Sequence, residues 1–187
     1  MSLELAIPVM ISGRETERTT RLRSMVEDHF ETVWRALRRL GVPEAGADDG
    51  AQQVFLVASR RLEEITTGGE RSYLLGIALR VASEARRALS RRREVPIDGQ
   101  DLDSTSAGAP PHRPDDALEQ KQALARLAAI LDRMPDELRE AFVLFELEEL
   151  SAPEVASVLD VPVGTVASRV RRAREQLRKG LTERGTP

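Results

Sequence analysis

A run of arginines and short hydroxyl side chains near the C-terminus has the residue types that read duplex DNA. Thr165, Ser168, Arg169 and Arg172 are spaced at i, i+3, i+4 and i+7, so on a helix they share one face. Arginine can donate a forked pair of hydrogen bonds to guanine, while neighbouring arginines neutralise phosphates. Further arginines flank this face: Arg171, Arg174 and Arg178. We therefore predict a DNA-reading surface made of these residues.

A solvated basic helix end is the alternative interpretation, because cations are favoured near a helix C-terminus. Six basic residues stand against the single acidic Glu175 between Arg169 and Lys179. This excess is larger than compensation of the helix dipole requires, so we favour contact with DNA.

The residues before this face have the pattern of a helix-turn-helix. Ser151 and Glu154 have capping-box spacing, which predicts a helix start, and residues 155–159 form an apolar stripe. Residues 160–162 interrupt the stripe with a turn of helix-turn-helix length that ends in proline. The second helix has apolar residues in steps of four, three, four and four: Val166, Val170, Ala173, Leu177 and Leu181. One side of that helix should therefore pack, leaving the arginine side outward.

The rest of the chain also has helical periodicity. Apolar stripes predict three helices in the first half, over residues 22–40, 47–65 and 73–89, the first of them closed by Gly41 and Pro43. A further helix from about residue 115 continues past Pro135. No strand-like alternation persists anywhere, so the predicted fold class is all-α.

Composition divides the chain into two small helical domains. Residues 95–114 are rich in proline, glycine, serine and aspartate and have almost nothing to bury, which indicates a flexible acidic linker. We predict a first domain over residues 21–94 and a second, four-helix domain over residues 115–187 that ends in the helix-turn-helix. Residues 1–20 are predicted to be a mobile tail.

Several classes of protein are disfavoured by composition. Among 187 residues there is no cysteine, and His29 and His112 are the only histidines, so we expect no disulfide, no metal site and a reducing, cytoplasmic setting. The apolar run near the N-terminus follows Glu4, unlike a signal peptide, and no segment reaches membrane-spanning length. Membrane insertion is therefore not expected.

An enzyme is also the least expected class. Acidic pairs such as Glu148 and Glu149 are consecutive, and consecutive helical residues diverge rather than converge on a substrate. The sequence has no phosphate-cradling glycine loop and no nucleophile near a base. We predict no catalytic residue, no cofactor and no small-molecule substrate.

Charge is unevenly distributed along the chain. The net charge of −3 argues at first against a nucleic-acid binder, because attraction to phosphate dominates nonspecific affinity. A second basic region nevertheless ends the first domain, and acidic residues follow it in the linker. Its arginines are Arg80, Arg86, Arg87, Arg91, Arg92 and Arg93. We expect such a chain to bind DNA poorly alone and better when a partner holds it in place.

This order of parts resembles the two-domain extracytoplasmic-function (ECF) sigma factors of bacterial RNA polymerase, over nearly all of residues 21–182. The strongest likeness runs from Met134 to Leu177, which is similar to the family's region 4 and includes its GTV-x-SR-x-x-RAR core at residues 164–174. The resemblance implies that this domain reads the minus-35 promoter element. Asp160 stands where the family usually has glycine, but aspartate tolerates a left-handed backbone, and Ala167 replaces a residue that is often basic.

The first domain resembles the family's region 2. Its polymerase-docking motif, D-x-x-Q-E-V-F, corresponds to residues 49–55, which implies polymerase-binding roles for four residues: Asp49, Gln52, Gln53 and Phe55. Gln53 replaces a carboxylate and Gly50 a large apolar residue. These two departures predict weaker docking than is usual in the family.

The family's promoter-melting segment also has a counterpart, beginning at Tyr73 in place of tryptophan. The resemblance implies contacts with the melted minus-10 element through five residues: Tyr73, Arg80, Arg86, Arg87 and Arg91. An exposed aromatic ring can stack on an unpaired base, and arginine contacts phosphate. For Tyr73, burial in the core is as plausible as stacking, because this residue opens an apolar stripe.

The favoured function is therefore a sigma factor whose partners are core RNA polymerase, promoter DNA and an anti-sigma factor. One alternative is a sigma-like decoy that occupies a partner protein through region 2 without initiating transcription. Another is a stand-alone helix-turn-helix regulator that uses only the second domain.

Overall fold

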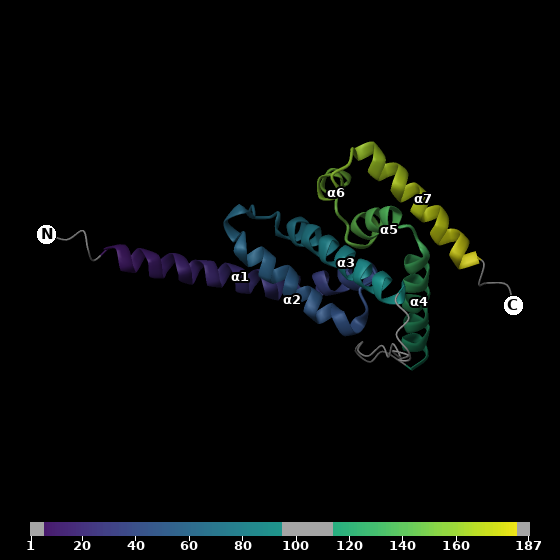
Figure 1. Ribbon diagram of the computed structural model, residues 1–187, viewed down its shortest axis with the longest axis horizontal. Helices are drawn as coiled ribbons and strands as arrows, with labels where there is room; N and C mark the ends of the chain where they lie inside the picture. Colours follow the sequence, from purple (N-terminus) through teal and green to yellow (C-terminus); the bar gives the residue numbers. More distant parts are fainter. Residues whose placement is uncertain (1–5, 95–113, 183–187) are drawn as a thin grey trace.

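A computed structural model describes residues 6–94 and 114–182, and every regular element within those ranges is a helix (Figure 1). The first half contains α1 (Ala6–Arg39), α2 (Glu44–Arg60), the short 3-10 helix η1 (Leu62–Glu64) and α3 (Glu70–Glu94). The second half contains α4 (Pro114–Arg133), α5 (Asp136–Phe142), the π-helical turn η2 (Val143–Leu147), α6 (Ala152–Leu159) and α7 (Val163–Thr182). The all-α prediction is confirmed.

The first helix begins earlier than the sequence pattern indicated. We expected residues 1–20 to be a tail, whereas α1 starts at Ala6; residues 1–5 lie outside the described ranges. Arg18 donates a 2.9 Å hydrogen bond to the carbonyl oxygen of Ser59, and Arg21 forms an ion pair with Glu70 at 3.5 Å. These two contacts join the α1 residues just before the apolar stripe to later segments of the chain.

A buried glycine brings the helices of the first domain close together. Gly50 lies inside α2, and a Cβ atom added there would stand 3.1 Å from Cδ1 of Leu37 on α1 and 3.7 Å from Cγ1 of Val81 on α3. The glycine that departs from the family motif therefore lies at a close approach of three helices.

The helix-turn-helix is formed as predicted. The hydroxyl oxygen of Ser151 accepts from the amide of Glu154, and the Glu154 carboxylate accepts from the amide of Ser151 at 2.8 Å. Asp160 ends α6 with φ 52° and ψ 51°, the left-handed conformation that aspartate tolerates. Val166 and Val170 on α7 are buried in one cluster with Val155 and Ala156 of α6.

The two domains pack against each other, which the sequence pattern did not predict. Ala36 of α1 and Leu75 of α3 share a buried cluster with residues of the second domain, among them Leu144 and Leu150. Figure 1 shows α6 and α5 next to α3, and a Cβ atom added at Gly76 of α3 would lie 3.8 Å from Val158 of α6. Apart from Pro114, which begins α4, the predicted linker lies outside the described residues.

Candidate nucleic-acid interface

Helix α7 carries the predicted DNA-reading residues on the sides that do not pack. Its buried stripe is Val166, Val170 and Ala173. Thr165 and Ser168 are half-buried, and the Ser168 hydroxyl donates to the Thr165 carbonyl oxygen at 2.9 Å. The exposed members of the predicted set are the arginines at four positions: Arg171, Arg172, Arg174 and Arg178.

Two arginines on opposite flanks of α7 are paired with carboxylates of preceding elements. Nη2 of Arg169 lies 2.9 Å from Oε2 of Glu137 in the first turn of α5. On the other flank, Nε of Arg174 donates to Oε1 of Glu146 at 2.9 Å, and Nη2 of Arg174 contacts the same oxygen. The sequence pattern missed both pairs, because neither carboxylate lies on α7.

The remaining arginines of α7 differ in their partners. Arg171 pairs with Glu175 one turn later on the same helix, at 3.4 Å. Arg172 and Arg178 form no ion pair with any residue within the described ranges. Their charges are therefore the ones most directly available to phosphate groups.

The second basic region lies on α3. Arg80, Arg87 and Arg91 are exposed, whereas Tyr73 is half-buried and packs against the core of the first domain. The side of α3 that carries Leu75 and Gly76 is covered by the second domain. The structure therefore places Tyr73 partly in the core and leaves three of the predicted α3 arginines at the surface.

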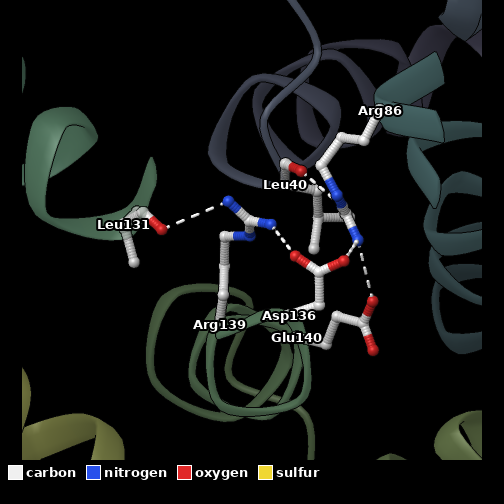
Figure 2. A network of polar contacts seen from close by, with 6 residues as sticks. All are labelled: Leu40, Arg86, Leu131, Asp136, Arg139 and Glu140. Atoms are coloured by element: carbon white, nitrogen blue, oxygen red, sulfur yellow. Dashed lines mark hydrogen bonds and ion pairs between the residues drawn. The ribbon is translucent and has the colours of Figure 1, made fainter. Parts of the chain in front are cut away.

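Arg86 of α3 lies in a polar network between the two domains (Figure 2). Its Nη1 donates to the carbonyl oxygen of Leu40 at 2.6 Å, and its Nη2 lies 3.0 Å from Asp136 and 3.1 Å from Glu140 of α5. Burial raises the pKa of Glu140, although the bond from Arg86 opposes that shift. Arg86, predicted to contact melted DNA, thus binds the second domain in this arrangement.

Arg139 extends the same network into the second domain. It is buried, donates to the carbonyl oxygen of Leu131 at 3.2 Å and pairs with Asp136 (Figure 2). Burial lowers the pKa of Arg139, and the nearby positive charge of Arg86 lowers it further. Arg139 therefore ties the first turn of α5 to the end of α4.

A second ionic contact joins the domains at Glu148, which is only 1% exposed. Its carboxylate lies 2.6 Å from Nη1 of Arg39 on α1 and 3.7 Å from Nη2 of Arg71 on α3. Burial raises the pKa of Glu148 despite these two cations. No local sequence signal could indicate this contact, because its partners lie in the other domain.

The predicted polymerase-binding residues lie on and beneath one face of α2. Asp49, Gln52 and Gln53 are exposed, and Leu56 continues their face one turn later as an exposed apolar residue. Phe55 is buried instead, so it supports this surface from within. Sequence reasoning missed Leu56 as part of this surface.

Phe55 is covered by an aromatic residue of the first helix. The Phe30 ring of α1 stacks on the Phe55 ring, with centroids 6.3 Å apart, and Phe30 itself is exposed. The exposed Phe30 ring and the exposed Leu56 each add apolar area that can be buried against a protein partner.

Two other kinds of site are absent from the part of the chain that the structure describes. No group of three or more His, Cys, Asp or Glu side chains there could hold a metal ion. None of the described helices combines the length and apolar character that a membrane crossing requires.

Comparison with known proteins places the second domain in a described family. A protein-family model, "Sigma-70, region 4", matches residues 124–177. This range contains the helix-turn-helix and both carboxylates that pair with α7.

Curated relatives extend the similarity to both domains. The ECF RNA polymerase sigma factor SigE of Mycolicibacterium smegmatis is 31% identical over 159 residues, which cover 85% of this chain and 61% of that protein. The ECF RNA polymerase sigma-E factor of Escherichia coli K12 is 30% identical over 141 residues, covering 73% of this chain and 74% of the relative. The chain therefore spans less than two thirds of the first of these relatives and about three quarters of the second.

Solved structures share the fold over most of the chain. CnrH, solved in complex with the cytosolic domain of CnrY, is 27% identical with a TM-score of 0.64, covering 88% of this chain and 89% of that chain. The sigma factor RpoE from Bartonella quintana, solved in complex with the anti-sigma factor NepR, is 19% identical with a TM-score of 0.63. The match covers 86% of this chain and 96% of that chain. The second likeness is one of fold.

Proposed function

This chain belongs to the family of ECF RNA polymerase sigma factors, which direct RNA polymerase to promoters, and from that premise we propose how its two domains divide the work. The second domain reads the minus-35 element through α7, and the first domain binds core polymerase and engages the melted minus-10 element. The observation that carries this proposal is the outward arginine surface of α7, on a capped helix-turn-helix. As a sigma factor, the protein acts by binding rather than by catalysis.

The alternatives are not favoured. A stand-alone regulator would need only the second domain, but the similarity to sigma factors covers 85% of the chain in one relative and 73% in another. A decoy without initiating activity has no support among these relatives, which are named as sigma factors.

Polymerase docking is assigned to the exposed face of α2. Asp49, Gln52 and Gln53 supply its polar groups, while Leu56 and the Phe30 ring supply apolar area. A few residues carry most of the binding energy of a protein interface, and polar groups around them add complementarity. Gln53 offers a neutral amide where the family usually has a carboxylate, so Gln53→Glu should tighten docking.

An anti-sigma factor is the expected regulatory partner. Two solved structures with this fold contain a second protein: CnrH is bound to the cytosolic domain of CnrY, and the sigma factor RpoE is bound to the anti-sigma factor NepR. A partner that stabilised the packed arrangement of the two domains would also keep Arg86 bound to Asp136 and Glu140. Because a sigma factor acts on RNA polymerase, we expect this protein to be located in the cytoplasm.

The proposal is tested by run-off transcription on fragmented genomic DNA, with host core polymerase in the presence and absence of the protein. Every new 5′ end is mapped, and start sites that require the protein should share two upstream elements. In the double variant Arg169→Ala/Arg172→Ala, these start sites should disappear while binding to core polymerase is retained. Arg126→Ala/Arg133→Ala, at exposed arginines of α4, is the matched control and should keep them.

Equal loss of polymerase binding and promoter recognition in the Arg169/Arg172 variant would contradict the assignment of the second domain. Absence of any protein-dependent start site, with polymerase binding intact, would contradict the promoter-directing role itself.

A further inference from the structure

We infer that Glu137 is a specificity-determining residue of the promoter-reading surface, which acts by positioning Arg169. The inference rests on the proposed role of α7 and adds to it a residue outside the recognition helix. It starts from the different surroundings of the arginines on α7.

Arg169 is more buried than the two other arginines of α7 that form ion pairs, Arg171 and Arg174. Its side chain is 18% exposed, and its guanidinium group uses Nη2 to contact Glu137 at 2.9 Å. The other four N–H donors of the guanidinium group are not used by this contact, which leaves a forked pair for a base edge. Arg169 also lies in the first half of α7, and recognition helices contact bases mainly through their N-terminal residues.

Glu137 is itself held on a fixed support. It lies in the first turn of α5, where buried Arg139 binds Asp136 and the carbonyl oxygen of Leu131 at 3.2 Å. Helix α5 also packs along α7. The Glu137 side chain is 71% exposed, so it reaches Arg169 from the edge of the reading surface and not from the core.

This arrangement should favour contacts of Arg169 with bases over contacts of Arg169 with phosphates. A free arginine side chain loses rotamer entropy when it binds DNA, whereas a restrained one has already lost part of it. The Glu137 carboxylate also offsets the positive charge of Arg169, which weakens its attraction to phosphate but leaves its donors for guanine. Arg172, exposed and without an ion pair to any described residue, has the opposite properties and suits phosphate contact.

The test uses the holoenzyme, formed from core polymerase and the full chain. It is equilibrated with duplexes that carry a randomised minus-35 region, and the bound fraction is sequenced. For Glu137→Gln, we expect base preference at the position read by Arg169 to fall about fivefold, since one bidentate contact is weakened. Binding to random-sequence duplex should rise, with a log–log salt slope steeper by about one.

Glu175→Gln is the matched control. This variant also removes one negative charge next to an arginine of α7, but the partner here, Arg171, is highly exposed and lies on the same helix as Glu175. We expect random-sequence binding to rise in this variant as well, with base preference unchanged. A loss of preference equal to that of Glu137→Gln would overturn the inference, because charge alone would then explain both.

A double-mutant cycle separates positioning from a general structural effect. In an Arg169→Ala background, Glu137→Gln should cause no further loss of base preference, because Arg169 is the group through which it acts. A further fivefold loss would show that Glu137 acts by another route, and the inference would be wrong. If the wild-type holoenzyme selects no sequence at all, the proposed reading of the promoter by α7 is contradicted. This result differs from one in which only the role of Glu137 is contradicted.

Discussion

Gly50 and Gly164 are both helical glycines, but an added methyl group would meet different surroundings. At Gly50 the new Cβ would stand 3.1 Å from a fully buried Leu37 side chain, whereas at Gly164 no atom lies within 4 Å. Alanine gains about 1 kcal/mol of helix propensity, and overpacking costs about 1–3 kcal/mol. We expect Gly50→Ala to lower the free energy of unfolding by about 1 kcal/mol and Gly164→Ala to raise it by about 0.5 kcal/mol. Urea unfolding measures both, and a stabilised Gly50→Ala protein would contradict the close packing.

Glu148 should give the protein a distinctive dependence on pH. Burial raises its pKa above the ordinary 4.5, so the folded state binds its proton more tightly than the unfolded state does. Its contribution to stability is therefore complete below pH 4.5 and is lost as pH rises through the raised pKa. The difference in unfolding free energy between wild type and Glu148→Gln should decrease over that interval, as measured by urea unfolding at several pH values.

Glu154 provides the comparison of opposite sign for that experiment. Its bonds from Ser151 lower its pKa below 4.5, so the difference between wild type and Glu154→Gln should increase as pH rises toward and past 4.5. If the two differences in unfolding free energy changed in the same direction with pH, burial would not govern the pKa of Glu148.

The helix-turn-helix was predictable from the sequence because local residues determine it. The Ser151–Glu154 capping box and the left-handed Asp160 involve contacts within one or two turns, and the apolar stripe of α7 is visible in the spacing of its own residues. The contacts of Arg18 and Arg21 on α1 were not predictable in this way, since they join residues more than 40 positions apart. The pairs of Arg169 and Arg174 with carboxylates likewise depend on how α5 and η2 pack on α7.

The contribution of the N-terminal cap of α6 to stability can be tested by substitution. Ser151→Ala removes a bond to the Glu154 amide and one to its carboxylate, so we expect a loss of about 1 kcal/mol in unfolding free energy at pH 7. Because the cap is strongest with ionised Glu154, this loss should shrink as pH falls below 4.5. Ser157→Ala, at an exposed position inside the same helix, is the control and should be neutral or slightly stabilising. Equal losses at the two serines would contradict the capping role.

At the scale of the whole molecule, the packing of one domain on the other is the feature that sequence reasoning did not find. Arg39 and Glu148 are 109 positions apart, and the sequence around each of them predicts only an exposed charged side chain on a helix. Arg86 was likewise predicted to contact DNA, whereas in the structure it joins Leu40 to Asp136 and Glu140. A promoter-binding role for Arg86 therefore requires that these bonds be exchanged for bonds to DNA.

Gly76 offers a direct way to separate the domains without changing a charge. A Cβ atom there would lie 3.8 Å from Val158 of α6, which is ordinary van der Waals contact, so Gly76→Ala should fit and gain up to about 1 kcal/mol of helix propensity. A phenylalanine ring does not fit at that separation, and Gly76→Phe should weaken the contact between domains by about 1–3 kcal/mol. The domain equilibrium would then shift about 5- to 150-fold toward the separated form.

Small-angle X-ray scattering on the free protein checks this prediction, with circular dichroism to confirm that the helices remain. The radius of gyration should increase for Gly76→Phe and stay at the wild-type value for Gly76→Ala. The domain contact also holds Arg86, so the separated form should bind single-stranded DNA more tightly, and Arg86→Ala should remove that gain. An unchanged radius with lower thermal stability would instead show that the ring is accommodated inside one domain and that the domains remain packed.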